Sequence, residues 1–378
     1  MMHDHSLFFH DDGKIYMVYG VRKIKLVELK EDLSGIKPGT EQLIIEDAGA
    51  PSNTKEGLGG EGSQLYKLNG KYYLFNITWP RGNMRTVVIH RASQIQGPYE
   101  GKLALQDLGV AQGGLIDDLK GNWYAYLFRD YGAVGRIPYL VPVSWENGWP
   151  ILGNAGKVPV NLDLPASTGL IPGIVSSDEF YRAKSMIELP LVWQWNHQPD
   201  NRFWSLREKY GFLRLKTGRL DTSFLQARNT LTQRTIGPTF SVEIYLDGSK
   251  MKDGDRAGLG LLQKNYGLIG VKKKGKEYVV YVINAGTGIP EEMELIKTRK
   301  AKIYLKADCD FTNMKDSADF FYSFNGKDWI KAGTSLKMSY TLPHFMGYRY
   351  ALFNYATKET GGWVDFDYYR ISTAINKN

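Results

Sequence analysis

Three short polar segments occupy equivalent places in the first part of the chain, and two of them carry a carboxylate. They are His3-Asp4-His5, Gly60-Glu61-Gly62 and Ala111-Gln112-Gly113. Hydrolysis of a glycosidic bond needs two carboxyl groups flanking that bond, one of them held protonated near neutral pH. Asp4 and Glu61 offer such a pair, and the glycines beside Glu61 allow the backbone to approach a ligand closely. Repeat geometry alone leaves a second interpretation open, in which Glu61 is an ordinary loop carboxylate and Asp4 a terminal residue without a role.

Each polar segment leads into a hairpin of the same design, an apolar strand, a turn containing glycine and an aromatic strand. The three hairpins read SLFFHDDGKIYMVY (6–19), SQLYKLNGKYYLF (63–75) and GGLIDDLKGNWYAYLF (113–128). Asp-Gly and Asn-Gly are strong hairpin signals. A hairpin recurring roughly every 40 to 60 residues fits the four-stranded blades of a β-propeller, although other antiparallel proteins contain similar hairpins. In a propeller, the polar segments would place Asp4, Glu61 and Gln112 at the inner rim.

The pattern changes after WENGWP (145–150). Residues 151–188 are rich in Pro, Gly and Ser and have no clear period, which is typical of a connecting segment. Short strands with Gly or Asn turns follow, and they predict an antiparallel β-sandwich. Clear examples are FSVEIYLDG (240–248), EYVVYVINA (277–285) and KIYLKADCD (302–310). The sequence therefore predicts an all-β chain with a propeller part at 1–188 and a sandwich at 189–378.

The composition agrees with this fold class and argues against several kinds of protein. The chain has 378 residues with 24 Tyr, 16 Phe, 9 Trp and 41 Gly, which favour pleated strands and turns. Its net charge of +8 is mild, and no basic helix points to nucleic acid. The single cysteine, Cys309, excludes an internal disulfide and a cysteine metal cluster. No apolar run is long enough to predict a membrane span.

Long segments of the chain resemble glycoside hydrolase family 43. The first hairpin with its polar segment is similar to the family's D-P-S-x-F-x-D-x-D-G-K-x-Y stretch, and EGSQLYKLNGKYYLF is similar to E-G-P-x-x-Y-K-x-x-G-x-Y-Y-L. HRASQIQGPYEG (90–101) resembles the R-S-x-x-x-x-G-P-Y-E stretch that follows. WQWNHQPDNRFWSL (193–206) and FNYATKETGGWVDFDYYR (353–370) resemble the concanavalin-like β-sandwich of β-xylosidase-like members. The resemblance covers nearly the whole chain.

This resemblance implies a five-bladed propeller and hydrolysis with inversion at the anomeric carbon. Three carboxylates take part in the family: an Asp base, an Asp that tunes the pKa and orientation of the acid, and a Glu acid. Glu61 matches the general acid and Asp4 the tuning Asp. Arg136, in a Gly-Arg-Ile-Pro block, matches an arginine that binds the sugar, with a structural ion pair as the alternative.

The chain also departs from the family pattern. The family's base Asp lies in the first blade, upstream of the segment at which this sequence starts, so we expect a three-blade arc that lacks the base, any signal peptide and activity of its own. Asp11, Asp12 and Asp117 lie in hairpin regions and do not replace the base convincingly. His5 replaces the Pro of D-P-S. Ala111 replaces a histidine that in some relatives lies near a water-bound calcium, so we expect no cofactor and regard calcium as doubtful.

Two functions from different classes follow. The first is an exo-acting α-L-arabinofuranosidase or β-xylosidase that acts on oligosaccharides from plant polysaccharides such as xylan. The alternative is a non-catalytic carbohydrate-binding protein built from propeller blades and a sandwich. In-frame coding sequence upstream, specifying two further blades and the base, would favour the enzyme. An arc of blades also exposes sheet edges, so we expect it to self-associate unless those edges are covered.

Overall fold

A computed structural model describes residues 2–164, 173–183, 188–341, 344 and 346–376. They form two compact units, one of residues 1–130 with 136–166 and one of residues 131–135 with 167–378. Among the described residues the helical elements are short 3-10 turns, namely η1 (Ala50–Ser52), η2 (Gly132–Val134), η3 (Asn201–Phe203), η4 (Phe224–Gln226) and η5 (Thr312–Met314). None of the helices in these ranges is long and apolar enough to cross a membrane. The all-β class is confirmed, and the domain division at residue 188 stays a prediction.

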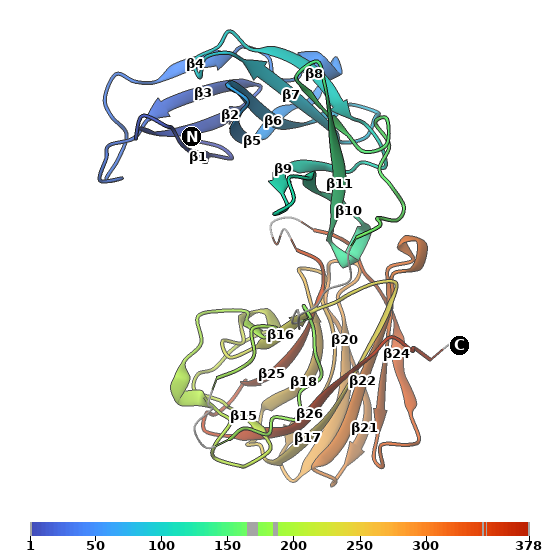
Figure 1. Cartoon of the computed structure of the whole chain (residues 1–378). Coiled ribbons are helices and arrows are strands. Elements are labelled where there is room, and N and C mark those ends of the chain that lie inside the picture. The colour runs from blue at the N-terminus through green and yellow to red at the C-terminus, as the bar shows by residue number, and fades with distance from the viewer. Residues whose placement is uncertain (1, 165–172, 184–187, 342–343, 345, 377–378) are drawn as a thin grey trace. The chain divides into compact units, whose positions relative to one another are not determined.

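The first unit contains three four-stranded antiparallel sheets in chain order, coloured blue to green in Figure 1. Each sheet is one predicted blade, with its strands paired in sequence order. The strands are β1 (Ser6–Phe9), β2 (Ile15–Val21), β3 (Lys23–Glu28) and β4 (Gln42–Ile45); β5 (Gly57–Leu68), β6 (Lys71–Pro80), β7 (Thr86–Ala92) and β8 (Glu100–Leu105); β9 (Ala111–Asp117), β10 (Trp123–Asp130), β11 (Arg136–Glu146) and β12 (Trp149–Leu152).

The hairpin turns follow the glycines that predicted them. Gly13, Gly70 and Gly121 have φ of +83°, +74° and +82°, and a Cβ at any of them would meet nothing within 4 Å. Glycine is therefore favoured there by the backbone angle and not by crowding. Side chains between the sheets hold neighbouring blades together, because Val18 of the first blade and Leu74 of the second belong to one buried cluster.

The second unit is a sandwich of two seven-stranded sheets, coloured yellow to red in Figure 1. One sheet has the order β13 (Gln194–Trp195), β16 (Leu231–Arg234), β25 (Arg349–Ala356), β18 (Asp255–Leu262), β19 (Gly267–Lys274), β20 (Glu277–Asn284) and β21 (Glu291–Thr298). The other has the order β14 (Trp204–Ser205), β15 (Leu213–Lys216), β26 (Trp363–Ser372), β17 (Thr239–Lys250), β22 (Lys302–Asp310), β23 (Ser317–Ser323) and β24 (Ile330–Lys337). The predicted antiparallel sandwich is confirmed.

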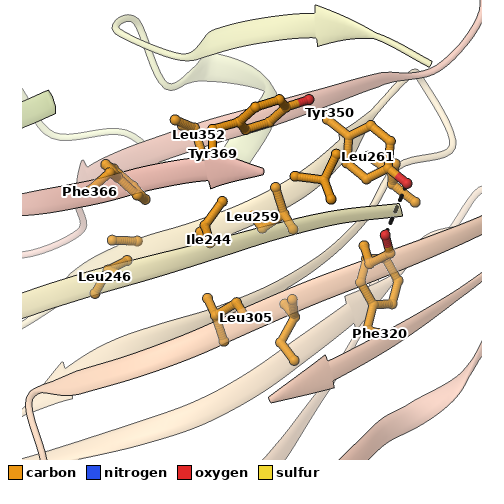
Figure 2. Packing of buried hydrophobic residues seen from close by; sticks show 14 of the residues in the cluster. Ile244, Leu246, Leu259, Leu261, Leu305, Phe320, Tyr350, Leu352, Phe366 and Tyr369 are labelled. Atoms are coloured by element: carbon orange, nitrogen blue, oxygen red, sulfur yellow. Dashed lines mark hydrogen bonds between the residues drawn. The ribbon is translucent and has the colours of Figure 1, made fainter. Parts of the chain in front are cut away.

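Side chains from both sheets interlock in the sandwich core (Figure 2). Leu259 and Leu352 come from one sheet, and Leu305 and Phe366 from the other; all four are fully buried. Alternate residues of each strand point inward because the side-chain period of a strand is two. Burying one such side chain contributes about 1.5–3 kcal/mol, so this core holds the second unit together.

Candidate active site

Glu61 lies on β5, the first strand of the second blade. The pairing of β5 with β6 shifts register on both sides of Glu61, between Leu58 and Glu61 and again between Glu61 and Gln64. Register shifts of this kind bend a strand and re-aim a side chain. The polar segment Gly60-Glu61-Gly62, predicted to precede the strand, is part of β5. The Glu61 side chain is 20% exposed.

The two glycines beside Glu61 are required by conformation and by crowding. Gly60 has φ of +122°, and a Cβ there would lie 2.6 Å from the Cβ of Ala48. Gly62 has φ of +65°, and a Cβ there would lie 2.7 Å from Nε2 of Gln112. The structure thus brings Gln112 of the third blade against the Glu61 segment, as the repeat predicted.

The first blade fixes the backbone of this segment. Arg22 donates its backbone N–H to the carbonyl oxygen of Gly60 at 2.8 Å, and Ala48 donates to the carbonyl oxygen of Arg22 at 2.8 Å. The Arg22 side chain also binds Asp47 at 2.7 Å. Glu61 is therefore positioned by contacts between blades as well as by its own strand.

Asp4 and Glu61 come together at His3. The Nε2 atom of His3 lies 2.9 Å from Oε2 of Glu61 and 3.7 Å from Oδ1 of Asp4. Asp4 has φ of +47°, and the backbone N–H of Gly20 donates to the carbonyl oxygen of His3 at 3.0 Å, which ties the terminal segment to β2. Sequence reasoning placed His3 in the polar segment but did not name it as a site residue.

Arg136 begins β11 and takes part in a network of charges. Its Nε atom lies 3.3 Å from Oδ1 of Asp130, and its guanidinium lies over the ring of Phe128 at 4.3 Å. Asp130 also pairs with Arg85, whose guanidinium stacks on Trp79 at 4.8 Å. The ion pair that the sequence left open is present, and a sugar contact by Arg136 stays a prediction.

One group of described residues has the ligand types that could hold a cation. His3, Asp4 and Glu61 each present one ligand atom, and these atoms lie within 4.8 Å of one another. A ring nitrogen among three ligands suits calcium poorly, since calcium prefers six to eight oxygen ligands. Ala111 is fully buried, and its methyl group offers no ligand at the position of the family histidine. The donor set does not fit calcium.

The site can supply a proton to a leaving oxygen. It holds the Glu61 carboxyl group, the His3 imidazole at hydrogen-bonding distance from it, and the Asp4 carboxylate with its ligand atom within 4.8 Å of theirs. Such a set is suited to acid–base catalysis. Asp11 and Asp12 lie in the turn between β1 and β2, where Asp11 pairs with Lys67 at 2.6 Å and Asp12 with Lys14 at 3.5 Å. Both lie in the hairpin region, as predicted; Asp12 pairs within the hairpin, whereas Asp11 pairs with a lysine of β5 in the second blade.

Comparison with known protein families gives two matches. Residues 1–150 match the family described as glycosyl hydrolases family 43. Residues 177–372 match the β-xylosidase C-terminal concanavalin A-like domain.

Individual proteins match over nearly the whole chain. The bifunctional GH43-CE protein of Bacteroides eggerthii is 57% identical with a TM-score of 0.94, covering 99% of this chain and 48% of its own. The β-xylosidase of Formosa agariphila is 27% identical, covering 98% of this chain and 69% of its own. An engineered family 43 glycoside hydrolase with both endo-xylanase and exo-arabinofuranosidase activity is 27% identical with a TM-score of 0.81, covering 99% of this chain and 74% of its own. This chain thus spans about half the length of the Bacteroides eggerthii protein.

Proposed function

Because the chain belongs to glycoside hydrolase family 43 and carries the concanavalin A-like domain of its β-xylosidases, we propose that it forms the acid-bearing part of an inverting, exo-acting glycosidase. The substrate is an oligosaccharide from which a terminal β-xylosyl or α-L-arabinofuranosyl unit is removed. The Formosa β-xylosidase and the engineered exo-arabinofuranosidase support these two sugars.

Glu61 is the general acid in this proposal, and Asp4 tunes and orients it. The observation that carries the proposal is the placement of Glu61 between two register shifts, flanked by glycines and 2.9 Å from His3. A carboxyl group held this way can donate a proton to the leaving oxygen while the glycines leave room for the sugar. Arg136 is proposed to bind the sugar, the role that the family resemblance implies for it.

We also propose that the 378-residue chain does not hydrolyse glycosides by itself. Inversion requires a second carboxylate to activate water on the opposite face of the sugar, roughly 6.5–9.5 Å from the acid. The family resemblance implies a base Asp upstream of the hairpin at 6–19, and Asp11 and Asp12, in the turn of that hairpin, each pair with a lysine. Oligosaccharide binding and self-association through the exposed edge of β1 remain open to the chain alone.

The stereochemical outcome tests the proposed mechanism. For this test the chain is extended at its N-terminus with two further blades and an Asp base taken from a family 43 glycosidase, and this longer protein is the extended version. Proton NMR then follows the anomer released from an aryl β-xyloside before mutarotation. The first sugar formed should be α-xylose, and Glu61→Gln should suppress its release from unactivated xylobiose. β-Xylose as the first product would contradict inversion and remove the proposed roles.

A further inference from the structure

A cavity of about 340 Å³ lies in the sandwich unit, apart from the residues of the candidate active site. Its walls come from three connecting segments, at 200–203, 216–221 and 228–229, and from β25. Its lining includes Asp200, Arg202, Phe203, Arg219, Asp221, Arg228 and Asn354. Its volume lies in the range of pockets that bind small molecules and suits a single sugar residue.

The lining carries more positive than negative charge. Its two carboxylates each have an arginine partner: Asp200 accepts from Nε and Nη2 of Arg202 at 3.0 and 2.7 Å, and Asp221 lies 2.9 Å from Nε of Arg219. The hydrogen bonds from Arg202 lower the pKa of Asp200 to about 2. Arg228 shares Asp200 with Arg202, which binds it more closely: Nη1 of Arg228 lies 4.0 Å from Oδ2 of Asp200, against 2.7 Å for Nη2 of Arg202. The cavity therefore favours an anion.

Hydrogen bonds hold the guanidinium groups of Arg219 and Arg228 in place and leave further N–H donors for a ligand. Arg228 donates Nε to the carbonyl oxygen of Gln198 at 2.9 Å, and Arg219 donates Nη2 to the carbonyl oxygen of Gln226. Within the described ranges, Nη1 of Arg219 and Nη2 of Arg228 have no partner. Fixed guanidinium groups of this kind can donate hydrogen bonds to the two oxygens of a carboxylate. An organic acid is therefore a better ligand than a monatomic anion.

The rest of the lining suits a sugar ring. The loop at Gly218 passes directly over Phe203, since a Cβ on Gly218 would lie 2.5 Å from the ring, and so fixes this ring as an apolar wall. Asn354 is 5% exposed and donates Nδ2 to the carbonyl oxygen of Leu215 at 2.8 Å. Its Oδ1 atom is buried and has no partner among the described residues. A buried acceptor without a donor is costly, and a ligand hydroxyl would satisfy it.

We propose that this cavity binds a uronic acid residue carried by an oligosaccharide. The carboxylate binds Arg219 and Arg228, a hydroxyl group donates to Asn354, and the ring packs against Phe203. Such a site would hold an acidic branch of a plant polysaccharide at the sandwich. The inference is independent of Glu61 and of turnover, because it concerns binding to the second unit alone.

Calorimetric titration of the 378-residue chain tests the proposal with three probes. They are a xylo-oligosaccharide with one glucuronosyl branch, the unbranched oligosaccharide of equal length, and inorganic sulfate. The branched probe should bind about tenfold or more tighter than either of the others, a difference of about 1.4 kcal/mol. Equal binding of the unbranched probe, equal binding of sulfate, or no binding of the branched probe would each overturn the proposal.

Two variants and a control locate the binding. Arg228→Gln and Arg219→Gln should each weaken binding of the branched probe about tenfold or more. Arg299→Gln is the matched control, because Arg299 is exposed in the sandwich unit and does not line the cavity. Arg219→Gln loses the ion pair with Asp221 and could disturb folding. In that case the affinity of Arg228→Gln alone decides the test. Unchanged affinity in folded Arg228→Gln would overturn the site.

Discussion

The Nε2 atom of His3 lies 2.9 Å from Oε2 of Glu61, so the segment before the first blade touches the carboxyl group of the second. The imidazole can donate to a Glu61 carboxylate or accept from a Glu61 carboxylic acid, depending on its tautomer. In the second arrangement His3 would orient the proton that Glu61 is proposed to give. A substrate oxygen would then replace His3 as the acceptor.

Replacing Glu61 should affect substrates according to their leaving groups. In the extended version, Glu61→Ala should slow hydrolysis of xylobiose by about 10²–10⁴-fold. It should slow hydrolysis of an activated aryl xyloside far less, because a stable leaving group does not need the proton. Steady-state rates on both substrates measure the difference. Glu46→Ala is the control, since Glu46 is an exposed glutamate that pairs with Lys23 at 3.1 Å. Equal losses on the two substrates would remove Glu61 from the acid role.

The glycine before Glu61 should be less replaceable than a glycine in a turn. Gly60→Ala combines an unfavourable φ with a contact at 2.6 Å to Ala48, and should cost about 2–4 kcal/mol of unfolding free energy. Gly13→Ala has an unfavourable φ but open space, and should cost about 1–2 kcal/mol. Urea unfolding of both variants measures the two costs. If Gly60→Ala lowers the free energy of unfolding no more than Gly13→Ala does, Ala48 moves aside at little cost and the prediction is wrong.

His90 should make the first unit sensitive to acid. Burial lowers the pKa of His90 to about 4, below its ordinary value of 6.5, and the side chain is 3% exposed. The unfolded chain therefore binds more protons between these two values, so stability is lost as pH falls from about 6.5 to about 4. Between pH 7 and pH 4.5 this amounts to about 2–3 kcal/mol.

His90→Leu should remove this contribution, because leucine is similar in size and does not titrate. Urea unfolding of the original chain and the variant at both pH values isolates the histidine, since all other groups cancel in the comparison. A loss of stability that is the same in both proteins would contradict the prediction.

The exposed edge of the first blade should promote self-association. β1 is an edge strand, and its Leu7 and Phe9 side chains are 47% and 67% exposed. Exposed apolar edge strands pair readily with other chains. Light scattering should show a mass that rises with concentration, and Phe9→Lys should reduce it. Leu191→Lys, at an exposed position outside any strand, is the control. A monomer at all concentrations would contradict this expectation.

Local signals made the blades predictable, while contacts between distant segments did not appear in the sequence. Asp-Gly and Asn-Gly turns, with period-two aromatic strands, act over a few residues and located the three hairpins. Glu61 is a candidate because it occupies the same place in its repeat as Asp4 and matches the general acid of the family, and its role stays a prediction. The register shifts around Glu61 and the crowding of Gly60 by Ala48 depend on how two blades meet.

Long-range contacts also explain why the sequence did not predict the partner of Arg136 or the sandwich cavity. Arg136 lies opposite Asp130 only because β10 and β11 pair in one particular register, which the sequence does not specify. The sandwich cavity is built from segments more than a hundred residues apart, from Asp200 to Tyr355. In the sequence its arginines cannot be distinguished from ordinary surface charges, because only the folded chain brings them together.

We propose that this chain carries the acid of a glycosidase without its base. The decisive experiment compares the 378-residue chain with the extended version on an aryl β-xyloside and an aryl α-L-arabinofuranoside. We expect the chain alone to be slower by about 10²–10⁴-fold or more, the loss expected for a missing base. Turnover by the chain alone within about tenfold of the extended version would contradict it, since that loss is too small for an absent base.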